Sequence, residues 1–511
     1  MSENKAGEEQ SGATNGAAKG TPKDPARRDL LLGSLIAGLA AGGVGSALPE
    51  GAHAQGSAIK PTDSADVVIV GAGFAGLAAA RALKAAGRSV IIVDGRDRVG
   101  GRAYSEQVKL GGWVDMGAQW LGPDQTRVLE IAKEVGAQTF PSHVEGKGVL
   151  IIGGKRSTFT MVPKEEYPGF SEAEMADVAQ AFSSLDTMAA AVPKDAPWSA
   201  PKAREWDSMT LESWMDQNVK TAAGRAAVRI FVLGYQACEP SDISLLHMLF
   251  YIAAGGGFES LHVGGIAYRV VGGTFQIAAG MAKDLQDAIR LGTTVITIDQ
   301  SAADKVRVAT NKGVLEGKRV IVACAPAMAN LLNYVPDLPA SRMQFTQRVP
   351  MGSSIKCHVV YPTPFWREKG LSGITTSDST PLSFTFDNSP PSGKPGILAA
   401  FFEGQESRAF AGKPEAEIRK TIIDNLVEFF GSEAANPAEV FIKIWDADPW
   451  ARGCFSGIMP PSVWTDYPDA IRRPVDRIHW AGTETATRWY AYLEGAVQSG
   501  ERAAKEVNGK L

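Results

Sequence analysis

The first regular hydrophobic pattern in the chain is the β-branched run 67–70, which predicts a buried parallel strand. A glycine-rich turn, GAGFAG at 71–76, follows it at once, and an Ala- and Leu-rich segment to Ala86 predicts a helix. A second apolar run, 89–93, ends at an acid, Asp94. Strand, glycine turn, helix, strand and acid in this order are typical of a dinucleotide-binding unit.

The glycines of the turn, Gly71, Gly73 and Gly76, have separate roles in such a unit. One makes the tight turn, one lets the backbone approach a pyrophosphate, and one packs the helix on the strand. The positive end of the helix then faces the phosphates. The acid, about 20 residues further on, binds a ribose hydroxyl. Both NAD and FAD are bound by this arrangement, so the unit alone does not choose between them.

Three later patterns predict further elements. Ser171 and Glu174 fit a capping box, and the apolar residues that follow on one helical face are Met175, Val178, Phe182 and Leu185. Near the C-terminus the pattern predicts a strand at 477–481, a loop containing Glu484, and a helix that begins near Gly495.

The polar residues Ser354, Lys356 and His358 alternate with apolar neighbours, which predicts a strand with one polar face. An interior lysine is costly unless a partner or a water satisfies it. Lys356 therefore either points to solvent or has a partner at a functional site.

Composition narrows the function classes. The 511 residues suggest two or three folding units, and 44% apolar and 21% charged residues suit a globular protein. A formal net charge of −4 gives no indication of nucleic-acid binding. The cysteines show no CxxC pair and no metal-ligand spacing, so neither a metal site nor a disulfide framework is expected; they are Cys238, Cys324, Cys357 and Cys454.

Residues 1–54 are predicted to lie outside the fold. Positions 1–25 are polar and are expected to be disordered. The pair Arg27-Arg28 then precedes a weakly apolar, glycine-rich run, and AHA at 52–54 offers a small-residue cleavage site. This is typical of a signal peptide for the twin-arginine export machinery, which implies a periplasmic protein exported in its folded state. The alternative is a membrane anchor, which the glycines disfavour; no later run is long enough to span a bilayer.

Long segments of the chain resemble one enzyme family. RDRVGGR at 96–102 adds a second glycine pair and Arg102 beyond the acid, an element that separates FAD enzymes of the amine oxidase type from NAD enzymes. With GAQWLGPDQTRVLEIAKEVG at 117–136, RVPMGSSIKCHVVYPTPFW at 348–366 and RPVDRIHWAGTETATRWYAYLEGAVQSGERAAKEV at 473–507, the chain resembles the flavin-dependent monoamine oxidases. The resemblance covers residues 66 to about 508.

The resemblance implies an α/β fold in which a Rossmann-like FAD-binding domain is interleaved with an α+β substrate-binding domain. The FAD-binding domain is expected to comprise 60–150, 265–340 and 440–511, and the substrate-binding domain 151–264 and 341–439. No internal repeat is visible. The animal enzymes end in an apolar anchor helix, whereas this sequence stops at Leu511, so a soluble enzyme is expected after export.

The resemblance also implies which residues bind FAD. They are Gly71, Gly73, Phe74, Ala75, Gly76, Asp94, Arg96, Gly101, Arg102, Ala118, Gln119, Trp120, Val295, Cys454, Glu484 and Val497. The family usually has Glu where this chain has Asp94, followed by Gly95; the shorter acid is expected to accept the same hydrogen bond after some backbone adjustment. The C-terminal helix is expected to direct its N-terminus at the flavin pyrimidine ring.

The resemblance implies catalytic roles for four positions. Phe455 and Tyr492 match two rings that stand over the flavin and keep the amine neutral, with Tyr commoner at the first position. Lys356 matches a lysine that holds a water against flavin N5, and Trp445 a tryptophan beside the flavin. Core packing is the alternative for each aromatic residue.

Cys454, in RGCF, matches a cysteine that some members bond to the flavin 8α-methyl, so FAD is either attached through a thioether or lies beside a free thiol.

The substrate pocket is assigned to Ala254, Leu371 and Phe384. Ala254 stands where the family often has Gln, and Leu371 where one animal enzyme has a gating tyrosine. Both changes remove polar groups, so a wider and more apolar chamber is expected, and no pair of acids is visible that would hold a polyamine.

The predicted reaction is the FAD-dependent oxidation of an aryl-alkyl primary or secondary amine to an imine and then an aldehyde or ketone, with O₂ reduced to H₂O₂. Phenylethylamine, tyramine and pseudooxynicotine are candidate substrates. The alternatives are a dehydrogenase that passes electrons to a cytochrome or quinone, a polyamine oxidase, and a flavin-binding scaffold without turnover. Carotene desaturases share the N-terminal pattern but are not expected to carry the Lys356 segment. The oligomeric state is open, with a homodimer as one candidate.

Overall fold

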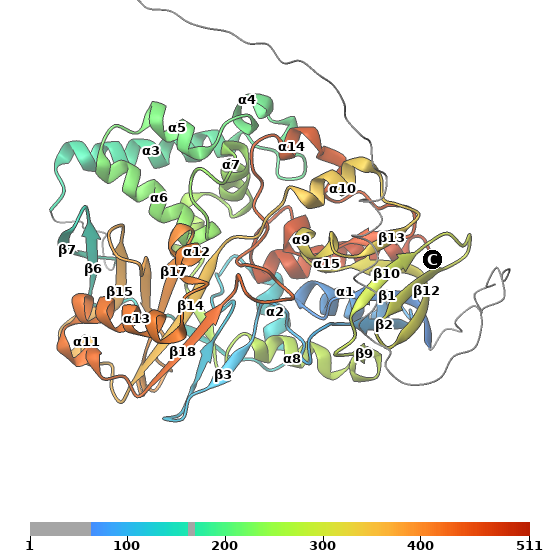
Figure 1. Cartoon of the computed structure of the whole chain (residues 1–511), viewed down its shortest axis with the longest axis horizontal. Coiled ribbons are helices and arrows are strands. Elements are labelled where there is room, and N and C mark those ends of the chain that lie inside the picture. The colour runs from blue at the N-terminus through green and yellow to red at the C-terminus, as the bar shows by residue number, and fades with distance from the viewer. Residues whose placement is uncertain (1–62, 162–168) are drawn as a thin grey trace, which may run out of the picture. The chain divides into compact units, whose positions relative to one another are not determined.

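The computed structural model describes residues 63–161 and 169–511, and the predicted signal peptide at 1–54 lies outside them. Eight strands form the first sheet, in the order β13-β10-β11-β12-β1-β2-β9, with β19 paired to β12 (Figure 1). Their bounds are β1 Asp63–Val70, β2 Val90–Val93, β9 Ile289–Arg290, β10 Val295–Asp299, β11 Val306–Thr310, β12 Gly313–Val322, β13 Asn333–Val335 and β19 Ile478–Trp480. The strands β19, β12, β1, β2 and β9 run parallel, as the buried run 67–70 predicts.

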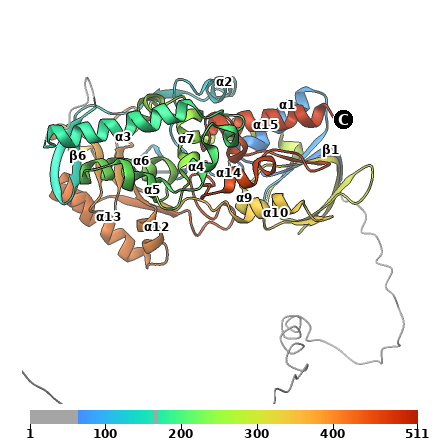
Figure 2. The ribbon, with the colours of Figure 1, turned by 90° about the horizontal axis from the view of Figure 1, so that it is seen from above.

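Helices cover one face of this sheet (Figure 2). On one face α1 (Phe74–Ala85) packs against α15 (Leu493–Asn508), with α2 (Thr126–Glu134) and α8 (Phe275–Lys283) beside them. On the other face, β1 and β2 pack against residues of β10 and β11 and against Ala329 of α9 (Pro326–Ala329). Helix α10 (Ala340–Gln347) packs beside α9. The predicted strand–turn–helix–strand unit is confirmed, and the C-terminal helix begins at Leu493, two positions before the predicted start.

Seven strands form the second sheet, in the order β18-β14-β17-β16-β15-β6-β7. Every pair is antiparallel except β15 with β6. The strands are β6 Lys147–Ile152, β7 Lys155–Thr160, β14 Ser354–Tyr361, β15 Leu371–Ser377, β16 Phe384–Asp387, β17 Gly396–Glu403 and β18 Glu439–Ile444. Two small antiparallel pairs complete the strands: β3 Ser105–Gln107 with β4 Trp113–Asp115, and β5 Thr139–Pro141 with β8 Tyr268–Val270.

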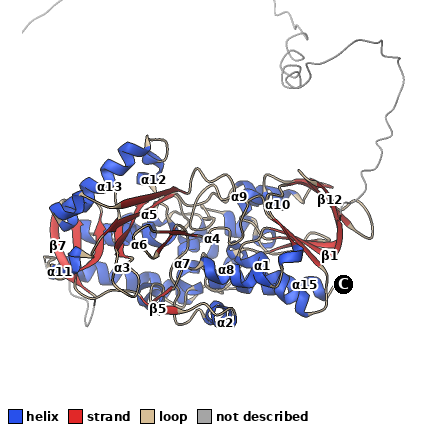
Figure 3. Cartoon of the chain, turned by 90° about the horizontal axis from the view of Figure 1, so that it is seen from below, coloured by secondary structure: helices blue, strands red, loops and turns tan. Residues whose placement is uncertain are grey.

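The second sheet lies between two groups of helices (Figure 3). The helices α11 (Phe365–Glu368), α12 (Gln405–Phe410) and α13 (Glu415–Phe430) pack on one face. A helical group packs towards the other: α3 (Glu172–Ala190), α4 (Ala203–Asp207), α5 (Leu211–Asn218), α6 (Ala222–Gln236), α7 (Leu245–Ala254) and α14 (Val463–Asp466). The capping box of α3 is confirmed, because Ser171 and Glu174 each bond the other's backbone.

The strand β14 has the predicted two faces. Ile355, Cys357 and Val359 belong to the apolar cluster beneath α13. Lys356 and His358 point to the opposite face, and all eight residues of the strand are buried. The polar face of this strand is therefore interior, and its groups have to be satisfied by protein partners or by a bound molecule.

The predicted domain limits can be compared with the sheets. The strands of the first sheet come from 63–93, 289–335 and 478–480, inside the three ranges expected for the FAD-binding domain. The limits at residues 150 and 440 cut β6 and β18, whose pairing continues the second sheet. Within the described residues, no helix has the length and apolar character needed to cross a membrane. No disulfide joins any of the four cysteines, all of which lie in the described part of the chain.

Candidate active site

A cavity of ≈ 650 Å³ connects the glycine turn of the first sheet with the interior face of the second sheet. Its walls include 70–71, 73–75, Asp94–Arg96 and 293–295 at one end, and Lys356, Cys454 and Tyr492 further along. Beyond these residues it continues between α3, α6 and the strands β16 and β17. Groups from distant parts of the chain therefore face one continuous space.

The glycine end of the cavity is shaped for a close backbone approach. Gly71 has φ +110°, which favours glycine, and Gly101 (φ +58°) passes the backbone of Gly73. A Cβ on Gly76 would lie 1.9 Å from the carbonyl oxygen of Gly71, so this glycine packs the helix against the turn, which is its predicted packing role. Gly76 does not line the cavity, so its predicted contact with FAD is corrected. The N-terminus of α1 has no side-chain cap, which leaves backbone N–H groups available to an anion.

Asp94 closes the end of β2. One carboxylate oxygen accepts from the backbone N–H of Ala72 at 2.8 Å and the other from Arg96 at 2.9 Å. The following Gly95 is required sterically, because a Cβ there would lie 2.4 Å from the ring of Trp450. Trp450 also lines the cavity, although the sequence analysis did not identify it.

Arg102 is held in place by protein groups. Its guanidinium donates to Glu484 at 2.7 and 3.2 Å and to the backbone carbonyl of Phe455 at 2.8 Å. Glu484 does not itself line the cavity, so its predicted contact with FAD is corrected: it orients Arg102 from behind. Arg96 is similarly paired with Asp448 at 2.6 Å.

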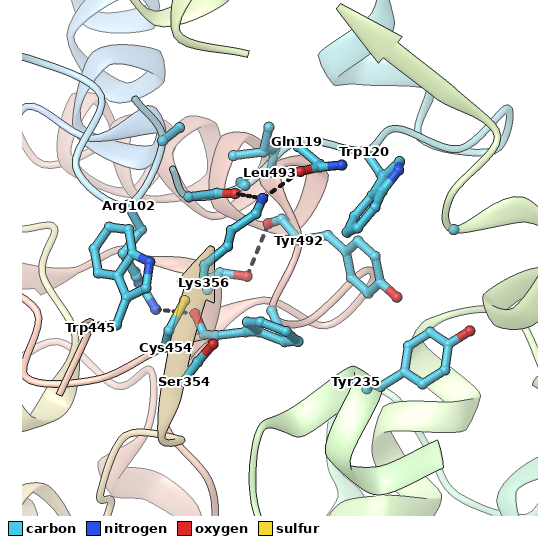
Figure 4. A pocket seen from close by; sticks show the side chains of 18 of the residues that line it. Arg102, Gln119, Trp120, Tyr235, Ser354, Lys356, Trp445, Cys454, Tyr492 and Leu493 are labelled. Atoms are coloured by element: carbon cyan, nitrogen blue, oxygen red, sulfur yellow. Dashed lines mark hydrogen bonds between the residues drawn. The ribbon is translucent and has the colours of Figure 1, made fainter. Parts of the chain in front are cut away.

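Lys356 projects from β14 into the cavity (Figure 4). Its side-chain nitrogen donates to the carbonyl of Gly117 at 2.8 Å and to Oε1 of Gln119, and the residue is only 3% exposed. Burial lowers the pKa of Lys356 to about 7, and the nearby carboxylate of Asp115 opposes this shift. The lysine is thus an interior group with partners, and the solvent-facing alternative is excluded.

Cys454 and Trp445 lie together beside the cavity (Figure 4). The indole N–H of Trp445 donates to the carbonyl of Met116 at 3.0 Å. Burial raises the pKa of the Cys454 thiol to about 12, although Arg102 acts in the opposite direction. Both side chains therefore face the cavity at fixed positions.

Tyr492 has a hydroxyl partner that the sequence analysis did not identify. Tyr251, fully buried on α7, donates to the Tyr492 hydroxyl at 3.0 Å, and the two rings stack at 6.3 Å. Phe455 and Tyr492 both line the cavity, as predicted. A hydrogen bond between two distant tyrosines has no signal in one sequence, because the fold alone brings α7 to the start of α15.

The far part of the cavity, which we call the chamber, is strongly apolar. Its lining side chains include Phe159, Met175, Phe182, Ile230, Phe231, Phe384, Phe386 and Phe401. Two predictions here are wrong. Ala254 is packed in the core of the helical group and Leu371 against the apolar cluster beneath α13, and neither lines the cavity. Phe384 does line it.

One further cofactor prediction is wrong. Val497 is fully buried between α15 and the first sheet, whereas Leu493 and Ala496 of the same helix line the cavity. The remaining predicted cofactor residues all line it: Gly71, Gly73, Phe74, Ala75, Asp94, Arg96, Gly101, Arg102, Ala118, Gln119, Trp120, Val295 and Cys454.

These residues fit FAD. The bare glycine backbone and uncapped helix suit a pyrophosphate, and Asp94 suits a ribose hydroxyl. Lys356, Trp445 and Cys454 would surround a ring system further along the cavity. Among the described residues there is no group of His, Cys, Asp and Glu that could hold a metal ion.

Comparison with known proteins decides the family. The model of the flavin-containing amine oxidoreductases matches residues 74–508. The chain belongs to this family. It is 38% identical to an L-amino acid dehydrogenase of Synechocystis over 89% of this chain and 97% of that protein. It is 35% identical to human flavin-containing amine oxidase B, over 87% of this chain and 86% of that protein.

Solved structures agree with this family fold. A putrescine oxidase with putrescine bound superposes with a TM-score of 0.83 at 30% identity, covering 87% of this chain and 99% of that one. Cyclohexylamine oxidase from Brevibacterium oxydans gives the same score, identity and coverage. The enzyme is therefore a flavoprotein with the amine oxidase fold that catalyses FAD-dependent amine oxidation.

Proposed function

We propose that this amine oxidase acts on an aryl-alkyl primary or secondary amine and uses O₂, forming H₂O₂ and an imine that water hydrolyses to an aldehyde or ketone. The observation that carries the substrate class is the apolar chamber. An aromatic or alkyl group gains free energy by leaving water for such a surface, roughly 25 cal/mol per Å². A second ammonium group would lose its hydration there without a partner.

The lining carboxyl groups support this choice against a polyamine. Within the described residues only Asp94 and Glu403 line the cavity, and Asp94 belongs to the glycine end. Glu403 is 1% exposed, accepts from the Ser354 hydroxyl at 3.1 Å, and has its pKa raised well above the usual range by burial. A neutral carboxyl cannot provide the charge that a distal ammonium needs, so putrescine and spermidine are poor candidates.

The positively charged side chains that line the cavity argue against an amino acid substrate. Arg96 and Arg102 are both paired with acids, and Lys356 is bonded to Gly117 and Gln119. An α-carboxylate would therefore meet no unpaired guanidinium in the described lining. We infer an amine without a carboxylate.

The chain's own groups would prepare the amine for oxidation. Bound FAD supplies the two-electron acceptor. Phe455 and Tyr492 would flank the substrate nitrogen, exclude water from it and so favour its neutral form. Lys356 would hold a water at the reactive edge of the cofactor, and Arg102 would fix the loop that carries Phe455 through its backbone carbonyl.

The experiment is an anaerobic screen of amines by loss of the flavin absorbance. Aryl-alkyl amines should bleach it within seconds, and an amine-independent spectrum would indicate a flavin-binding protein without turnover. The name of the Synechocystis relative keeps a dehydrogenase as the second candidate. Mixing amine-reduced enzyme with air or with a soluble quinone separates the two: reoxidation by quinone alone would replace O₂ in the proposal.

A covalent bond between Cys454 and FAD is the second part of the proposal. Cys454 lines the cavity, and its N–H donates to the carbonyl of Gly352 at 2.7 Å, which fixes the loop. Forming the thioether removes the S–H hydrogen and one 8α-methyl hydrogen, so two protons and two electrons leave to O₂. Acid-precipitated enzyme should stay yellow, and the Cys454 peptide should carry the mass of FAD.

The control for this prediction is a second thiol of the same cavity. Cys324 also lines it, at the glycine end. Cys454→Ala should release all flavin on acid precipitation, whereas Cys324→Ala should retain it. Complete release from the wild-type enzyme would instead identify Cys454 as a free thiol beside the cofactor.

Export by the twin-arginine route is the third part, supported by Arg27-Arg28 before the Gly- and Ala-rich run. This route carries folded proteins, so FAD would be acquired in the cytoplasm. Replacing both arginines with lysine should leave folded, yellow enzyme in the cytoplasm. Cell fractionation measures this, and an unchanged periplasmic yield would contradict the route.

A further inference from the structure

A chain of buried polar side chains leads away from Lys356 into the protein. The ring Nε2 of His358 lies 2.8 Å from the carbonyl oxygen of Asp115, and its Nδ1 lies 3.4 Å from Nδ2 of Asn388. Oδ1 of Asn388 accepts from Nε2 of Gln119 at 2.8 Å, and Oε1 of Gln119 accepts from Lys356. All of these side chains are at most 3% exposed.

The donor and acceptor of every hydrogen bond in this series of side chains follow from the bond between His358 and Asp115. The Asp115 carbonyl can only accept, so Nε2 of His358 must carry the hydrogen. Burial lowers the pKa of His358 well below its usual value, so the ring is neutral and Nδ1 is an acceptor. Asn388 must then turn its NH₂ group towards His358 and its oxygen towards Gln119.

The same constraint passes through Gln119. Its NH₂ group must donate to Asn388, which leaves Oε1 to face Lys356. Lys356 therefore has two fixed acceptors, Gln119 and the Gly117 carbonyl. A lysine nitrogen has three hydrogens when charged, so one N–H, or the lone pair of the neutral amine, is left for the cavity.

We infer that His358, Asn388 and Gln119 are positioning residues. Together they hold the amide oxygen of Gln119 towards Lys356, so that the remaining N–H or lone pair of the lysine nitrogen points at the bound flavin. Loss of Asn388 would let the Gln119 amide rotate and present NH₂ to the lysine. Two donors facing each other disfavour the ammonium form, so the proton would leave Lys356 at lower pH. This inference rests on the proposed location of Lys356 beside the flavin.

Other groups around Lys356 act on its charge without fixing this direction. The charged or titratable neighbours are Asp115, Cys454, Arg269 and Glu403, and the rings of Trp120 and Phe401 lie 5.4 and 5.3 Å from its nitrogen. None of them is replaced in the variants below, so their contribution stays constant across the comparison.

The test is a pH titration of the flavin absorbance of oxidised holoenzyme, which measures protonation beside the ring and not turnover. The wild type should show a transition near pH 7, the pKa to which burial lowers Lys356, and Lys356→Met should abolish it. In Asn388→Leu the midpoint should fall by about one pH unit, since a hydrogen bond to a charged group is worth roughly that much. Thr385→Val, a buried polar change in β16, the strand that directly precedes Asn388, should keep the wild-type midpoint.

The same substitution in a second variant background separates an effect on the orientation of Lys356 from a general loss of packing. Gln119→Leu removes the amide through which Asn388 acts on Lys356, so adding Asn388→Leu to this variant should leave its midpoint unchanged. A midpoint that Asn388→Leu does not move in the wild-type background would overturn the inference, even if the variant melts at lower temperature. A transition that persists in Lys356→Met would overturn the proposed location of Lys356 as well.

Discussion

Lys356→Met is expected to retain FAD and to slow the redox cycle by about tenfold or more, the typical cost of losing one positioned polar group. The lysine is one of the few polar side chains at the middle of the cavity, and its bonds to Gly117 and Gln119 hold it in a single orientation. Methionine has nearly the same length but neither charge nor N–H donors. FAD should remain because the glycine end of the cavity is unchanged.

Anaerobic stopped-flow reduction by a good amine, followed by mixing with oxygenated buffer, measures the two half-cycles of Lys356→Met separately. A matched control is Lys443→Met, because Lys443 is paired with Lys356 across β14 and β18 but bonds to Asp448 instead. The control should react at close to the wild-type rate. Wild-type rates of both half-cycles in Lys356→Met would show that the lysine only packs the core.

The central unit of the first sheet could be predicted from local sequence patterns. The run 67–70, the glycines that follow and Asp94 form the predicted unit because each residue acts through its own neighbours in the chain. The capping box of α3 was predictable for the same reason, since Ser171 and Glu174 are three residues apart. The alternation along β14 gave its two faces, although not which of them would be buried.

The site is built from contacts between distant segments, so the sequence predicted some of its residues correctly and others not. Long motifs placed Lys356, Cys454 and Tyr492 at the cavity. Position by position, the resemblance failed where a side chain points away: Val497 lies on the core side of α15, while Ala496 beside it lines the cavity. The substrate positions Ala254 and Leu371 failed because a position matched in sequence does not fix which way its side chain points.

The preference for a substrate therefore depends on the residues that line the chamber, not on Ala254 and Leu371. We expect kcat/KM for phenylethylamine-type amines to exceed that for putrescine or spermidine by about 100-fold or more. The first group buries an apolar ring against side chains such as Phe384 and Phe401. The polyamines must desolvate a second ammonium, which costs several kcal/mol without a charged partner.

The size of the chamber can be tested at Ala227, a small residue of α6 that lines it. Ala227→Phe should lower kcat/KM for the bulkiest good substrate most and for a short amine least, because the new ring takes volume only in the chamber. Ala254→Gln is the comparison: it should lower the melting temperature through overpacking of the helical core and leave the substrate order unchanged. Measuring kcat/KM across an aryl-alkyl series and two polyamines decides the question, and a preference for the polyamines would show that a charge partner for the distal ammonium exists.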